Sequence, residues 1–89
     1  MRTIFKYEIP EDKSSVIRIQ KDHQILTAQC QYGRIKIWAV VDDNDINLVD
    51  VKFHLIGTGE EIPTNVKLKY VATIQTFAGT KVNHLFEEL

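Results

Sequence analysis

The sequence contains few cysteines, prolines and glycines and no long apolar run. Of its 89 residues, one is a cysteine, two are prolines and four are glycines. Because Cys30 is alone, neither an intrachain disulfide nor a cysteine zinc cluster can form, which indicates a reducing compartment. No apolar run is long enough for a signal peptide or a membrane helix. We therefore expect a cytoplasmic protein that does not engage a membrane.

An excess of charge of either sign is also missing. The chain has 11 basic and 12 acidic residues and a net charge of -1. Nucleic-acid-binding domains usually carry a basic excess or a basic stripe, so neither DNA nor RNA is expected as a partner. The hydrophobic fraction of 44% and the charged fraction of 26% are those of an ordinary globular protein. Residues 1–89 are predicted to form a single domain.

No window of the sequence has the apolar stripe of an amphipathic helix. Short runs that alternate or are rich in β-branched residues are present instead, at residues 3–9, 16–19, 25–31, 35–41, 48–56, 68–77 and 81–86. Turn signals separate these runs. The pattern predicts an all-β fold, a small antiparallel sandwich or barrel of about seven short strands.

Single features of these runs predict a hairpin turn, a central strand and the arrangement of the last run. Gly33 can supply the positive φ of a tight hairpin between residues 25–31 and 35–41. Residues 37–41 are apolar on both faces, which predicts a central strand. In the last run, alternation assigns His84 to the inner face, and the polar tail 87–89 is expected to fray.

Gly57-Thr58-Gly59 follows the fifth run and is the first candidate site. Two glycines around a threonine let backbone N–H groups converge on an anion such as phosphate. The lysine and helix of a phosphate-binding loop are absent, and Glu60 and Glu61 follow at once. A strand-ending turn that needs glycine is the more common explanation. His54 lies just before this turn, on the polar face of its run.

Trp38 is the second candidate, together with Lys36 and Arg34 on the same face of one run. If Trp38 points away from the core, the three side chains form a stacking and phosphate-contacting surface for a nucleotide-like ligand, or a protein contact. The alternative is a second small core that covers the other face of the sheet, since large aromatic residues are usually buried.

Catalytic and metal sites have weaker support. The spacing of His23, His54 and His84 shows no convergence, so no metal site and no cofactor are expected. Cys30 lies inside an apolar run, where an inert thiol is usual. A small hydrolase would need two or more of the three histidines, Glu60 and Glu61 within roughly hydrogen-bond reach of one pocket.

Several segments together resemble a known family. These are residues 3–10, 24–29, the tryptophan strand 37–42, 53–59 with 62–63, 70–75 and the ending 82–87. Over nearly its whole length the chain resembles a family of small uncharacterised proteins encoded by bacteriophages and prophages. It departs from the family pattern at Ala72 and Val82-Asn83, which puts no named function in doubt.

The resemblance implies a context rather than an activity. Small accessory phage proteins often block a host factor, inhibit a defence nuclease or sequester a signalling nucleotide. We therefore expect a non-catalytic binding protein in the cytoplasm of a host cell that inhibits a host or defence factor or sequesters a small anionic ligand. A homo-oligomer is expected because a short all-β chain has exposed strand edges, which partners commonly cover. Its candidate ligand-binding residues are Gly57, Thr58, Gly59, His54, Arg34, Lys36 and Trp38. The alternatives are a structural or virion-associated module without a ligand and, less favoured, the small hydrolase.

Overall fold

A computed structural model describes all residues, 1–89. The chain forms seven strands and no helix. The strands are β1 (Arg2–Ile9), β2 (Ser14–Gln20), β3 (His23–Gln31), β4 (Arg34–Asp42), β5 (Leu48–Gly57), β6 (Leu68–Thr76) and β7 (Lys81–Glu88). Each run predicted from the sequence is a strand, with ends that differ by one or two residues. No long apolar helix of the kind that crosses a membrane is present.

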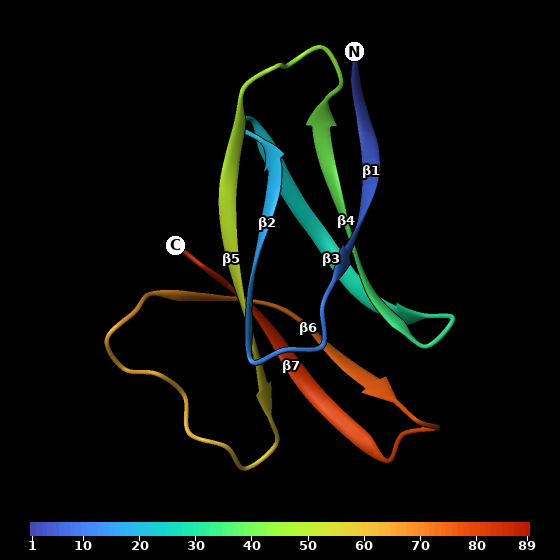
Figure 1. Cartoon of the computed structure of the whole chain (residues 1–89), viewed down its shortest axis with the longest axis vertical. Helices are drawn as coiled ribbons and strands as arrows, with labels where there is room; N and C mark the ends of the chain where they lie inside the picture. Colours follow the sequence, from blue (N-terminus) through green and yellow to red (C-terminus); the bar gives the residue numbers. More distant parts are fainter.

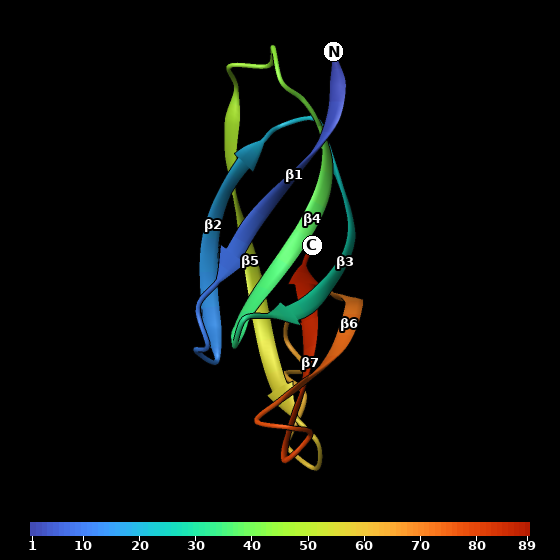
Figure 2. The ribbon, with the colours of Figure 1, turned by 90° about the vertical axis from the view of Figure 1, so that its right-hand side faces the viewer.

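The strands form two antiparallel sheets that pack face to face. Sheet A has the strand order β1-β4-β3, and sheet B has the order β2-β5-β7-β6 (Figure 1). In the view at right angles, β2 and β5 lie on one side and β3 and β4 on the other (Figure 2). The molecule is 16 Å across its shortest axis, as expected for two sheets packed about 10 Å apart. The all-β sandwich is confirmed, and β4 is a central strand as predicted.

The core lies between the sheets because each strand turns alternate residues inward. In β4, Ile35, Ile37, Ala39 and Val41 are buried, whereas the residues between them are partly exposed. The buried cluster joins residues of both sheets: Ile9, Ala28, Ile35, Ile37, Ala39 and Val41 from sheet A, and Ile19, Val51, Phe53, Leu55, Ala72, Ile74 and Leu85 from sheet B. The other face of each sheet is its outer face.

The β3–β4 connection is a two-residue hairpin turn formed by Tyr32 and Gly33. Gln31 pairs with Arg34, and the two turn residues have φ values of 53° and 76°. Gly33 supplies the positive φ that its position requires, as expected. Tyr32 adopts the same left-handed region, which a residue with a side chain rarely enters.

Two expectations for the last strand are wrong. Leu85, not His84, faces the core, because Leu85 is fully buried and pairs with Leu55, whereas His84 pairs with Ile56 on the outer face. The tail also does not fray. Glu87 pairs with Phe53 on one side and Lys69 on the other, and Glu88 pairs with Leu68. The polar tail is held because β7 lies between two neighbouring strands.

Candidate functional site

The Gly57-Thr58-Gly59 segment forms the turn that ends β5. The Glu60 N–H donates to the Gly57 carbonyl at 3.0 Å, and Gly59 has a φ of 88°. This geometry is that of a turn with glycine at its third position. The Gly57 N–H donates to the Glu60 carboxylate. The chain therefore places a negative charge of its own on a backbone donor that an anionic ligand would need.

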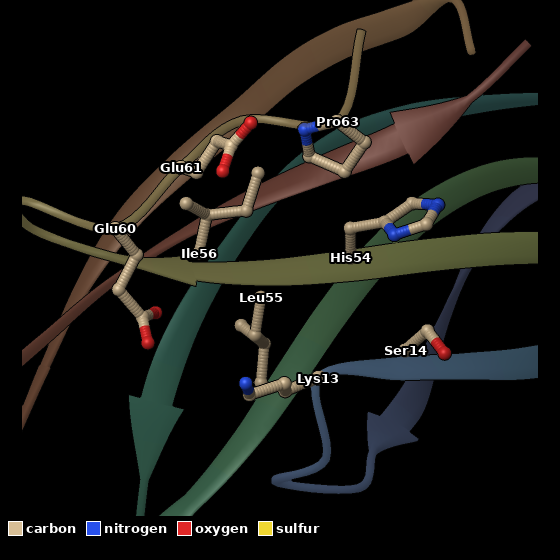
Figure 3. A pocket seen from close by; sticks show the side chains of 8 residues that line it. All are labelled: Lys13, Ser14, His54, Leu55, Ile56, Glu60, Glu61 and Pro63. Atoms are coloured by element: carbon tan, nitrogen blue, oxygen red, sulfur yellow. The ribbon is translucent and has the colours of Figure 1, made fainter. Parts of the chain in front are cut away.

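A hollow of about 430 Å³ lies beside this turn, where β5 extends beyond the start of β2. It is lined by Lys13, Ser14, His54, Leu55, Ile56, Glu60, Glu61 and Pro63. Figure 3 shows His54 and Ile56 on one side of β5, toward Glu61 and Pro63, and Leu55 on the opposite side near Lys13. Two carboxylates against one ammonium group make the wall of this hollow acidic on balance, which disfavours an anion.

His54 is held by a carboxylate of the last strand. Its Nε2 is 2.9 Å from the Glu88 Oε1, and because an ionised carboxylate only accepts hydrogen bonds, Nε2 is the donor. Both side chains are largely buried. This pairing orients the imidazole and explains why the tail of the chain stays in the sheet.

The other two histidines lie apart from His54. His84 is hydrogen-bonded to Thr58 through Nε2 and to Thr73 through Nδ1, each at 2.9 Å. The Nδ1 of His23 donates to the Gln20 carbonyl at 2.7 Å. No group of three or more histidine, cysteine, aspartate or glutamate side chains is arranged to hold a metal ion. His54, Glu60 and Glu61 line the same hollow, as the hydrolase alternative requires, and no hydrogen bond joins any two of its five residues.

Trp38 lies on the outer face of sheet A. Its neighbours Ile37 and Ala39 are fully buried in the core, and Trp38 is partly exposed between them. Lys6 of β1 and Thr27 of β3 pair with it across the sheet. Directly paired residues share a face, so Lys6 and Trp38 are neighbours on the outer face of sheet A. No element of the chain packs over this face, which therefore is not a second small core (Figure 2).

Arg34 and Lys36 continue the same face toward the hairpin turn. Both contact Glu8 of β1, the Arg34 Nη1 at 2.9 Å and the Lys36 Nζ at 2.7 Å. The Lys36 and Arg34 hydrogen bonds lower the pKa of Glu8 from its ordinary value of 4.5. The Lys6 Nζ of β1 donates to the Gln31 side chain of β3 at 2.8 Å, across β4. The cations are thus held in place by side chains of other strands of sheet A.

The seven candidate residues therefore divide between two sheets. Gly57, Thr58, Gly59 and His54 lie at the end of β5 in sheet B, whereas Arg34, Lys36 and Trp38 lie on β4 in sheet A. Arg34 lies away from the glycine turn, whereas His54 lies beside it. Arg34 lines a different hollow, between the ends of sheet A and the β6–β7 connection. The two candidates named from the sequence are therefore two separate surfaces.

Strand pairing brings to each surface residues that were not predicted from the sequence. Lys6 and Glu8 join the Trp38 face because β1 pairs with β4, and Glu88 joins His54 because β7 pairs with β5. Alternation does assign Lys6 and Glu8 to the polar side of their run. Nothing local to the sequence indicates which strand they face.

The fold and these surfaces define a small antiparallel β-sandwich with an open, cation-bearing sheet face. The chain belongs to the family described as domain of unknown function (DUF7352), whose model matches residues 1–89. No curated protein and no solved structure matches the chain.

Proposed function

We propose that the protein is a non-catalytic binding protein that holds a small anionic, nucleotide-like ligand on the outer face of sheet A. The observation that carries the proposal is the outward position of Trp38 in the central strand. Lys6, Lys36 and Arg34 lie on the same face of the sheet. A flat aromatic surface beside fixed cations suits a base joined to phosphate.

Each side chain has a distinct role in this proposal. Trp38 stacks on the base, a contact worth about 1–3 kcal/mol in related settings. Lys6 and Arg34 contact phosphate oxygens. Arg34 is suited to this because its side chain is 68% exposed and only its Nη1 is bonded to Glu8. A guanidinium group has further donors that can bind phosphate while this contact persists. Glu8 positions the two cations of β4.

The proposal includes the biological setting that the resemblance implies. Inside a host cell, a phage accessory protein of this kind would withdraw a signalling nucleotide from a defence factor. The same outer face could instead inhibit a host protein by direct contact, and the virion-associated module remains the structural alternative. Mass spectrometry of purified particles tests that alternative, because only a virion component would be found there.

Homo-oligomerisation is also part of the proposal. Strands β1 and β3 are the edges of sheet A, and β2 and β6 are those of sheet B. Unpaired strand edges are commonly covered by a partner. Sedimentation velocity over a range of concentrations should show a dimer or larger species. A monomer at all concentrations would contradict this part of the proposal and leave the binding face unaffected.

The single tryptophan makes the binding test direct. Because Trp38 is the only tryptophan, its fluorescence reports on the proposed site alone. Titration with ATP, GMP and cyclic dinucleotides should quench or shift the emission saturably. Calorimetry then gives the affinity of variants. Arg34→Ala should weaken binding roughly tenfold, as expected for the loss of one charge-assisted contact.

Lys52→Ala is the matched control, since Lys52 is an exposed cation on the outer face of sheet B. It should bind as the natural protein does. If none of the nucleotides changes the emission or gives heat, or if Arg34→Ala and Lys52→Ala have equal effects, the proposed function is wrong.

A further inference from the structure

Two exposed aromatic side chains lie at one end of the molecule. Tyr32 is in the β3–β4 turn and is 96% exposed, and Phe77 follows β6 and is 70% exposed. Both turns lie on the right of Figure 1. Tyr32 and Phe77 line one hollow of about 500 Å³ together with Pro10 and Arg34. This volume is within the range of sites that bind small organic molecules.

The fold gives no reason for an aromatic residue at either position. Tyr32 and Phe77 have φ values of 53° and 51°, in the left-handed region. Asparagine or glycine is favoured there, and a bulky residue is strained. Neither side chain belongs to the core. Strained, exposed aromatic residues that stabilise nothing within the chain indicate a contact with another molecule.

The hollow lies at the end of the row that begins at Trp38. Residues 34, 36 and 38 alternate along one face of β4, and the two-residue turn that carries Tyr32 comes directly before Arg34. At about 3.3 Å per residue, Arg34 and Trp38 are roughly 13 Å apart along the strand, and Tyr32 lies beyond Arg34. Arg34 and Lys36 lie between the two aromatic residues. This distance exceeds what one nucleotide can span.

The charges of this strip favour a polyanion despite the net charge of the chain. Lys6, Arg34 and Lys36 outnumber Glu8, to which the last two are bonded. The other acid at the hollow, Glu11, is paired with Lys81 at 3.1 Å. The absence of DNA and RNA partners was expected from the charge of the whole chain. The folded protein collects cations on one face that the total does not reveal.

We propose that the ligand held on this face is a single-stranded nucleic acid segment of about four nucleotides or more. The inference rests on the proposed function and names its ligand class. One base stacks on Trp38 and another enters the hollow between Tyr32 and Phe77. The intervening phosphates contact Arg34, Lys36 and Lys6. The flat open face suits bases that are unstacked from a partner strand.

The experiment compares ligands of increasing length. Fluorescence anisotropy with labelled single-stranded oligonucleotides, DNA and RNA, is measured beside Trp38 quenching by mononucleotides. Oligonucleotides should bind at least tenfold more tightly than mononucleotides, and the affinity should fall as salt rises. A duplex of the same sequence should bind at least tenfold more weakly than the single strand.

Tyr32→Asn separates binding from folding. Asparagine suits the positive φ, so the variant should fold and be as stable as the natural protein or more so. Oligonucleotide affinity should fall roughly five- to hundredfold, the loss of one stacked base. Ile46→Asn is the matched control, because Ile46 is an exposed loop residue, 91% exposed, outside this surface.

The outcomes are distinguishable. If mononucleotides bind at Trp38 but oligonucleotides bind no more tightly, or if Tyr32→Asn equals Ile46→Asn, this inference is overturned and the proposed function remains. Equal binding of duplex and single strand also overturns it. If neither mononucleotides nor oligonucleotides bind, both proposals fail.

Discussion

At the scale of single residues, the Gly57-Thr58-Gly59 motif has a structural role as the turn that ends β5. Sequence reasoning correctly identified a strand-ending turn that needs glycine, and Gly59 with its φ of 88° is that position. It could not show that the Glu60 carboxylate accepts the Gly57 N–H. That contact depends on a side-chain conformation within the turn. It makes an anion-binding role for the turn less favourable than the motif alone implies.

Thr76 offers a residue-scale prediction of stability. It is 5% exposed, and its Oγ1 has no hydrogen-bond partner. A buried hydroxyl without a partner is unfavourable, so replacement by the isosteric valine should stabilise the fold by about 1 kcal/mol. Urea unfolding of Thr76→Val measures the difference. Thr73→Val is the control, because Thr73 is exposed and bonded to Tyr70 and His84. Equal stabilisation by both changes would contradict the argument.

The pKa of Glu8 gives a second prediction at this scale. Hydrogen bonds from Lys36 and Arg34 lower it below 4.5 in the folded protein. A carboxyl group with a lowered pKa contributes stability above its ordinary pKa, and this contribution is lost as the pH falls through the folded value. A carbon-detected NMR titration should therefore give a Glu8 midpoint below 4.5. Lys36→Ala should raise the midpoint, and an unchanged midpoint would show that the contact is not formed in solution.

At the scale of strands, the alternation of the sequence predicted most of what was found. The inward residues of β4 and β5 were correctly assigned, because one face of each run is continuously apolar. The same rule failed for β7, where Val82 and Phe86 are apolar yet lie on the outer face. Phe86 packs there against Tyr70, with ring centroids 5.8 Å apart. Alternation misassigns a strand when its outer face carries an apolar contact of its own.

Strand pairing could not be predicted from the sequence. Most contacts of the candidate sites depend on that pairing, so they could not be predicted either. β1 pairs with β4 rather than with its neighbour in sequence, and β5 pairs with β7 rather than β6. These pairings join Lys6 to Trp38 and Glu88 to His54 across long stretches of chain. The residues of a local run can be ordered by face from sequence. The residues of a sheet surface can be known only once the pairing is known.

The end of β7 carries the prediction at this scale. The largely buried His54 donates to Glu88 at 2.9 Å, so Glu88→Ala leaves that donor without its acceptor. We expect a loss of about 1–2 kcal/mol, and a smaller loss for Glu88→Gln, which keeps an acceptor oxygen. Thermal unfolding measures both. If the two substitutions cost the same, the hydrogen bond does not hold the tail.

At the scale of the whole molecule, the inner faces of both sheets stabilise the fold, and the outer face of sheet A carries the proposed binding site. The inner faces share one core, so neither sheet can be stable alone. The outer face of sheet A has no covering element and carries the cations and Trp38. On sheet B, the segment 58–67 approaches the outer face and closes one side of the acidic hollow (Figure 3). Because only sheet B is approached by such a segment, the outer face of sheet A is the surface open to a partner.

Two phenylalanines test where stability resides in this arrangement. Phe53 is 1% exposed between the sheets, whereas Phe86 is half-buried on the outer face of sheet B. Phe53→Ala leaves a cavity in the shared core and should cost about 3–5 kcal/mol. That is a large part of the roughly 5–10 kcal/mol expected for a domain of this size. Phe86→Ala loses one aromatic contact and some buried area, and should cost about 1–2 kcal/mol. Urea unfolding of both variants decides the matter. A cost for Phe86→Ala equal to that for Phe53→Ala would mean that the outer face of sheet B is itself part of the core.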